Sequence, residues 1–198
     1  VSISLKNIGD AIANGVSATL STSDPYISIL NSTVSYGNMS ALSVSAGSGQ
    51  YRFSVSNDCP AGHTVQFVLT VTSGAETWHL SFSVVVYRPI LEFGTLTITD
   101  TTGDHDGNLD PGEAANISIL LNNIGGAGSP AGTASMTCAT TGITINNGAA
   151  SFNAIPSGGS TTLTFSLTAA SSMSIGTLAN AVFDATAGIY TATTNRTI

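Results

Sequence analysis

The chain has 198 residues, of which 42% are apolar and only 8% are charged, and its formal net charge is −7 at pH 7. This length and apolar content provide a core for one or two domains. The acidic balance argues against nucleic-acid binding, which needs a basic face, and no apolar stretch reaches the roughly 20 residues that a membrane helix requires.

Short segments with apolar residues at alternate positions recur along the chain, between clusters of Gly, Asn, Asp and Ser. This period-two pattern, rich in β-branched and aromatic residues, predicts β-strands. In chain order the predicted strands are Val1–Leu5, Tyr51–Val55, Val65–Val71, Trp78–Val86, Ile117–Leu121, Ile143–Ile145, Leu163–Leu167 and Ala181–Phe183. No window combines helical spacing of apolar residues with good helix formers, so we predict an all-β chain.

The chain also contains an internal repeat. The segment Val1–Gly9 aligns with Ile117–Gly125 at an offset of 116 residues. The same offset, followed by a small deletion, aligns Ala18–Leu20 with Ala134–Met136, Ile27–Ile29 with Ile143–Ile145, Val34–Tyr36 with Ala150–Phe152, and then Phe53–Val55 with Phe165–Leu167. We therefore predict two homologous β-sandwich domains, residues 1–88 and 89–198, with the boundary at Pro89, which cannot continue a central strand.

Acidic residues are concentrated in one segment, because five of the 11 Asp and Glu residues lie within residues 100–113. Side chains at alternate positions of a turning loop can point at one centre, and Ca²⁺ binds about six to eight oxygen ligands. The pattern predicts a structural calcium site with the ligands Asp104, Asp106, Asn108, Asp110 and Glu113, and with Asp100 as a weaker candidate. The alternative is a solvated acidic turn, since Asp, Asn, Gly and Pro are common turn residues.

This loop resembles the first half of an EF-hand, but Gly107 stands at its fourth position and no Glu stands at its twelfth. His105 alternates with the predicted ligands, and we expect it to face solvent. The loop directly precedes the second copy's strand at Ile117, so we expect calcium to fix the junction between the domains. The first copy's equivalent loop would precede Val1, and we therefore expect the chain to be a segment of a longer protein.

The two cysteines, Cys59 and Cys138, fall in different predicted domains, so we expect two separate thiols rather than a disulfide. Cys59 and His63 are four residues apart, and a structural turn with a buried thiol is favoured over a catalytic dyad. Trp78 is predicted to anchor the core, and the alternative is an exposed indole that stacks on sugar.

The sequence contains neither of two common catalytic motifs. The three histidines, His63, His79 and His105, lie in no G-x-S-x-G or H-E-x-x-H context. Serines are abundant, so chance alone offers many Ser–His pairings. We therefore expect a protein that is not an enzyme.

The motif D-x-D-G-x-x-D-P-G-E at Asp104–Glu113, followed by an alternating strand, and the Cys59–His63 block with a later Trp78 resemble known modules. These are the tandem Ig-like repeats of large secreted proteins of Bacteroidetes and their relatives, often found beside gingipain-like or subtilisin-like peptidase domains. The resemblance covers nearly the whole chain, but the second copy lacks the Cys-Pro-x-Gly-His block and the Trp. It implies Ig-like sandwiches at an extracellular or cell-surface location.

We therefore expect non-catalytic structural or spacer modules of a larger secreted or surface protein, rigidified by calcium. Their partners would be neighbouring domains of the same polypeptide, with no nucleic acid and no insertion into a membrane. One alternative is a self-assembling filament or surface layer, because low charge reduces resistance to packing and open sheet edges accept strands. Another is an adhesion or glycan-binding module.

Overall fold

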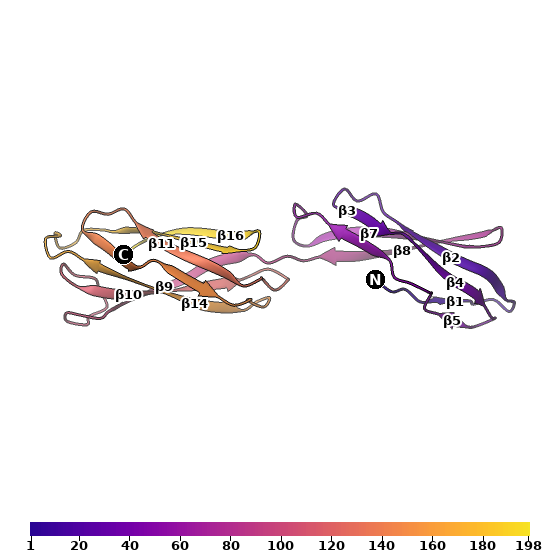
Figure 1. The fold of residues 1–198 in the computed structure, drawn as a ribbon, viewed down its shortest axis with the longest axis horizontal. Coiled ribbons are helices and arrows are strands. Elements are labelled where there is room, and N and C mark those ends of the chain that lie inside the picture. Colours follow the sequence, from indigo (N-terminus) through magenta and orange to yellow (C-terminus); the bar gives the residue numbers. More distant parts are fainter. The chain divides into compact units, whose positions relative to one another are not determined.

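The computed structural model describes residues 1–198 and contains β-strands but no helix (Figure 1). The prediction of an all-β chain is confirmed. No helix that could cross a membrane is present.

The chain divides into two compact units, Val1–Val86 and Tyr87–Ile198. Each unit has a hydrophobic core of its own. The division falls close to the boundary that Pro89 suggests.

The second unit is a sandwich of two four-stranded antiparallel sheets. Its strands are β9 (Leu91–Asp100), β10 (Ala114–Asn123), β11 (Gly132–Cys138), β12 (Ile143–Asn147), β13 (Ala149–Phe152), β14 (Ser160–Ala169), β15 (Asn180–Ala187) and β16 (Tyr190–Thr197). One sheet has the order β12-β14-β10-β9 and the other β13-β11-β15-β16. Ile117 and Phe165 of the first sheet and Met136 and Phe183 of the second are buried in one core. The alternating pattern that predicts these strands therefore directs one face of each sheet inward.

The first unit repeats one of these sheets and completes the other only in part. Its strands are β1 (Leu5–Lys6), β2 (Ala13–Ser21), β3 (Ile27–Asn31), β4 (Thr33–Met39), β5 (Val44–Ser45), β6 (Arg52–Val55), β7 (His63–Ser73) and β8 (Glu76–Val86). The four-stranded sheet has the order β4-β2-β7-β8, while β3-β6 and β1-β5 form two-stranded sheets. Of the predicted strand Val1–Leu5, only its end is regular, although Val1 and Tyr51 exchange backbone hydrogen bonds of 2.7 and 3.0 Å.

The strand registers show the internal repeat in three dimensions. Ser17 of β2 pairs with Ser35 of β4, and Thr133 of β11 pairs with Ser151 of β13. Both members of the second pair stand 116 residues after those of the first, which is the offset found in the sequence.

The later part of the alignment is wrong by two residues. Ile29 lies opposite Phe53, whereas Ile145 lies opposite Leu167, so Phe53 corresponds to Leu167 and not to Phe165. A slip of two residues keeps every side chain on the same face of a strand, and an alternating sequence therefore cannot exclude it.

Trp78 is not a core residue, and this prediction is also wrong. Its side chain lies on the edge strand β8 and is 47% exposed, although its cross-strand partner Val71 is only 7% exposed. In the second unit the corresponding edge strand β16 contacts β9 of the opposite sheet, where Arg196 donates a 3.4 Å hydrogen bond to the carbonyl oxygen of Phe93. Residues 1–86 contain no strand in the position of β9, so the inward face of β8 stays open at Trp78.

Candidate metal centre

The acidic loop connects β9 to β10 inside the second unit. The two strands stay paired as far as Asp100 and Ala115, and the N–H of Thr101 donates to the carbonyl oxygen of Ala114 at 2.7 Å. The loop therefore joins two neighbouring strands of one sheet. The expectation that this loop is the linker between the two units is therefore wrong.

Asp100, the last residue of β9, has the most unusual environment in this loop. It is 5% exposed, and its Oδ1 accepts a hydrogen bond of 3.0 Å from the N–H of Gly107. Its Oδ2 is buried and has no hydrogen-bond partner. An ionised carboxylate without a partner is costly to bury unless a cation compensates its charge. Asp100, which the sequence indicates only as a weaker candidate ligand, is thus the best-placed oxygen donor of the loop.

Asp100, Asp104 and Asp106 form a cluster that could hold a metal ion. Each offers one carboxylate oxygen, and the three oxygens lie within 4.8 Å of one another. Calcium binds oxygen at about 2.4 Å, so two of its ligands are at most about 5 Å apart. The side chains of Asp104 and Asp106 are exposed, which leaves room for water as further ligands.

Asn108 and Asp106 form a local hydrogen-bonded pair. The N–H of Asn108 donates to Oδ1 of Asp106, and its Nδ2 donates to Oδ2, both at 2.8 Å. In this geometry the amide nitrogen of Asn108 positions Asp106. The predicted role of Asn108 as a ligand stays a prediction.

Glu113 shapes the loop from its far end. Its side chain is buried, its Oε1 accepts from the N–H of Asp104 at 3.3 Å, and its Oε2 accepts from the N–H of Asp110 at 3.0 Å. Both oxygens therefore hold backbone groups of the loop. Asp110 is half-buried beside it, and neither residue belongs to the three-carboxylate cluster.

His105 has a left-handed backbone with φ of 63°. Its side chain is 64% exposed, in agreement with the prediction that it faces solvent. Its Nδ1 nevertheless donates to the main-chain oxygen of Asp100 at 3.0 Å and lies 3.9 Å from the orphaned Oδ2. His105 thus borders the cluster.

The carboxylates of the loop perturb one another. Burial raises the pKa of Asp110, and the charges of its neighbours, with Glu113 first, raise it further. The pKa of Asp106 is lowered because the backbone and then the side chain of Asn108 donate hydrogen bonds to it. Repulsion at Asp110 is what a bound cation would relieve.

The first unit contains a carboxylate–imidazole pair that the sequence did not indicate. His63 Nε2 lies 2.6 Å from Asp24 Oδ2, and its ring meets that of Tyr26 edge-on. The two partners are 39 residues apart in the chain, so no local motif connects them. Cys59 is buried, in agreement with the predicted turn and thiol, and its Sγ lies 3.8 Å from the carbonyl oxygen of Pro60.

No family model matches this chain, and no curated protein matches its sequence at a significant level. The resemblance to Ig-like repeat modules therefore stays a prediction.

Proposed function

We propose that this chain is a pair of non-catalytic, Ig-like structural modules of an extracellular protein, and that a calcium ion stabilises the β9–β10 loop of the second module. The observation that carries the proposal is the buried Oδ2 of Asp100, which has no hydrogen-bond partner and belongs to a carboxylate that clusters with those of Asp104 and Asp106. In this proposal the ion provides the missing partner.

Charge supports a divalent cation at this place. Residues 100–113 carry five carboxylates and no Lys or Arg. Hard oxygen ligands and partly solvated geometry suit Ca²⁺ better than a transition metal, which prefers imidazole or thiolate. Bound calcium would remove the repulsion and hold the loop in one conformation.

The exposure of the cluster supports an extracellular location. A site with only part of its shell provided by protein binds weakly, and extracellular calcium modules have dissociation constants of about 10⁻⁴–10⁻³ M. Such a site fills where calcium is abundant. The scarcity of charged residues, 8% of the chain, is consistent with a module that packs beside neighbouring domains of the same polypeptide.

Differential scanning calorimetry with calcium and with EDTA tests the proposal. We expect calcium to raise the unfolding temperature of the second unit by several degrees, and Asp100→Asn to abolish this increase. Glu92→Gln is the matched control, because Glu92 lies on the same strand but is exposed. Its calcium response should equal that of the unmodified protein.

Two results would contradict the proposal. One is an unfolding temperature that does not change between calcium and EDTA. The other is an equal increase with Mg²⁺ at the same ionic strength, which would indicate general screening of the acidic loop.

A further inference from the structure

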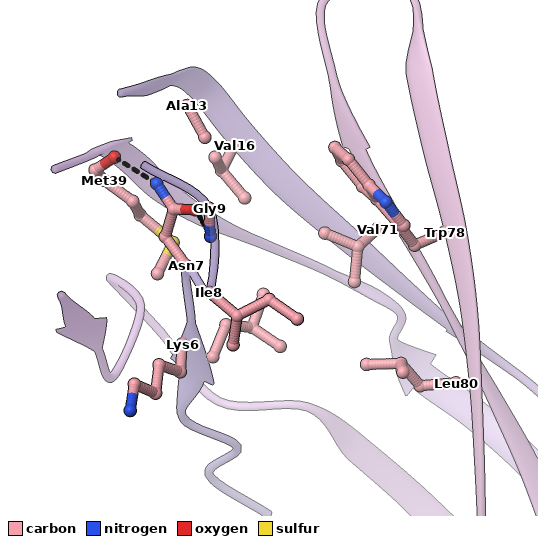
Figure 2. Close-up of a pocket in the computed structure, with 11 residues that line it drawn as sticks. Lys6, Asn7, Ile8, Gly9, Ala13, Val16, Met39, Val71, Trp78 and Leu80 are labelled. Carbon is pink, nitrogen blue, oxygen red and sulfur yellow. Dashed lines mark hydrogen bonds between the residues drawn. The ribbon is translucent and has the colours of Figure 1, made fainter. Parts of the chain in front are cut away.

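The first unit has an open apolar groove beside the edge strand β8. The groove encloses about 400 Å³. Figure 2 shows Trp78 and Leu80 on one side of it and Ile8 and Met39 on the other. Trp78 is 47% exposed, Leu80 50% and Ile8 83%. An apolar surface of this kind in one place is typical of an interaction site.

The second unit shows what fills the corresponding space. There, Leu91 and Phe93 of β9 are buried in the core, and the ring of Phe93 lies 6.2 Å from that of Phe183. Arg196 of β16 donates to the backbone oxygens of Phe93 and Gly94 at 3.4 and 3.3 Å. A strand therefore closes this side of the second sandwich.

The registers identify the corresponding positions on β8. Met136 stands 116 residues after Leu20 and corresponds to it in the repeat. Met136 lies opposite Phe183 and Leu20 lies opposite Leu69, so Leu69 corresponds to Phe183. The next strand places Thr194 opposite Phe183 and Leu80 opposite Leu69. Leu80 thus stands where the second unit has Thr194.

By the same pairing, Trp78 lies opposite Val71 where the second unit has Ala192 opposite Ala185. Both positions of β8 carry larger apolar side chains than their counterparts on β16. The first unit therefore exposes more apolar surface at the place where the second unit is closed by a strand.

We infer that this groove accepts an extended peptide strand from outside residues 1–198, which adds antiparallel to the segment Val1–Lys6 as β9 adds to β10. In β-strand addition, backbone hydrogen bonds provide affinity and alternate side chains enter pockets. The groove provides an apolar pocket that both Trp78 and Ile8 line.

The backbone of the N-terminal segment has a free side for this strand. Val1 uses its N–H and C=O groups to pair with Tyr51, as Ile117 pairs with Phe165 in the second unit. Consecutive residues of a strand direct their hydrogen-bonding groups to opposite sides. The groups of Ser2 therefore point to the side on which β10 carries β9.

Charge complementarity defines the incoming strand further. In the second unit Glu92 lies opposite Asn122, and Asn122 corresponds to Lys6. Lys6 lines the groove and is the only lysine of the chain. The strand that fits best carries an acidic residue opposite Lys6 and, one position further, an aromatic residue opposite Leu5, as Phe93 lies opposite Leu121.

The probe is a synthetic peptide with the β9 sequence Leu91–Asp100, added to the 198-residue protein. Trp78 is the only tryptophan, so its fluorescence reports the groove directly. We expect a saturable blue shift of the emission. Leu80→Glu should weaken binding at least tenfold, whereas Val85→Glu should bind as the unmodified protein does, because Val85 is 40% exposed on the opposite face of β8.

A charge exchange tests the orientation of the strand. Lys6→Glu should weaken binding of the unmodified peptide. A peptide with Glu92→Lys should bind this variant better than it binds the unmodified protein, since opposite charges then face each other again. Equal binding of both peptides by both proteins would contradict the proposed register.

Other occupants of the groove would overturn the proposal. An emission that does not respond to the peptide, or equal effects of Leu80→Glu and Val85→Glu, would contradict strand binding. Concentration-dependent dimers that Leu80→Glu disrupts would make a second copy the occupant, and a blue shift with oligosaccharides alone would make it a sugar site. The titration is repeated in EDTA, where binding should persist, because no residue of the calcium loop lines the groove.

Discussion

The carboxylate of Glu113 occupies the space in which a Cβ atom on Gly103 would lie. Gly103 has φ of +103°, in a region that side chains other than glycine rarely adopt. Glu113 is buried against it and holds the backbone N–H groups of Asp104 and Asp110. The conformation of the acidic loop therefore depends on the absence of a side chain at Gly103.

Gly103→Ala should destabilise the second unit more than Gly107→Ala. Both substitutions place alanine at positive φ, which costs about 1–3 kcal/mol. At Gly107, with φ of +86°, a Cβ meets nothing within 4 Å, so the backbone strain acts alone. At Gly103 the carboxylate of Glu113 must also move and release its two N–H donors. Urea unfolding of the two variants measures the difference, and equal free energies of unfolding would show that Glu113 moves aside without cost.

The charge of Asp110 should destabilise the calcium-free loop as the pH rises. Burial and the neighbouring carboxylates raise its pKa above 3.8 in the folded protein. The folded state then binds this proton more tightly than the unfolded state. The stabilisation of the folded state by protonated Asp110 is therefore complete below pH 3.8 and is lost as the pH rises through the raised pKa. In EDTA, Asp110→Asn should remove this loss and raise the unfolding temperature at neutral pH.

Asp106→Asn is the control for this pH dependence, because its effect should have the opposite sign. The hydrogen bonds from Asn108 lower the pKa of Asp106. Its ionised carboxylate therefore stabilises the folded state above the pKa that it has in the unfolded chain, and this stabilisation is lost as the pH falls through the lowered pKa. Calorimetry in EDTA from acid to neutral pH compares the two variants. If Asp110→Asn lowers the unfolding temperature at neutral pH, the repulsion among the carboxylates does not govern this loop.

The sequence predicts the strands because one face of each sheet is buried. Alternation at Ile117–Leu121 and Leu163–Leu167 follows directly from the inward side chains of β10 and β14. Strand β9 is absent from the predicted strands, since Gly94 interrupts its alternation at a point where the register with β10 shifts. A β-bulge of this kind leaves no periodic signal.

The missed strand also explains the errors at the site. Asp100 ends β9, so its burial depends on a strand that the pattern does not show. Trp78 is a large aromatic residue of the kind that usually anchors a core. It is exposed only because no strand within residues 1–86 covers it. Clustering of acidic residues is visible in a sequence, but the hydrogen bonds that distinguish Glu113 from Asp100 depend on the folded loop.

The Asp24–His63 pair should make the first unit sensitive to acid. Burial opposes the charge of Asp24, but hydrogen bonds from His63 and from the N–H of Tyr26, together with the charge of His63, outweigh it and lower the pKa below 3.8. Its stabilising contribution is therefore present above pH 3.8 and is lost as the pH falls through the lowered pKa. His63→Gln should reduce this loss and lower the unfolding temperature at neutral pH.

The fluorescence of Trp78 measures the acid unfolding of the first unit alone, because the second unit has no tryptophan. His79→Gln is the matched control: His79 contacts the hydroxyl of Thr70 at 3.1 Å and no carboxylate. Identical acid unfolding of His63→Gln and the unmodified protein would show that the pair makes no net contribution.

Tyr51 of the first unit and Phe165 of the second stand at corresponding positions. We expect Tyr51→Phe and Phe165→Tyr each to destabilise its own unit, by different amounts. The hydroxyl of Tyr51 donates to the carbonyl oxygen of Ala18 at 3.2 Å and lies 3.3 Å from that of Tyr36. Burial and the hydrogen bond with Tyr36 raise the pKa of Tyr51, so it stays a neutral donor. Tyr51→Phe loses these bonds and should cost about 1 kcal/mol.

Phe165→Tyr should cost more, because Phe165 is fully buried and Phe152, which corresponds to Tyr36, brings no hydroxyl to meet the new one. A buried hydroxyl without a partner costs about 1–3 kcal/mol. Urea unfolding of each variant, followed by Trp78 fluorescence for the first unit and by circular dichroism for the second, gives the two free energies. A smaller loss for Phe165→Tyr than for Tyr51→Phe would show that the second core already contains an acceptor for this hydroxyl, and that the two cores differ less in polarity than their sequences do.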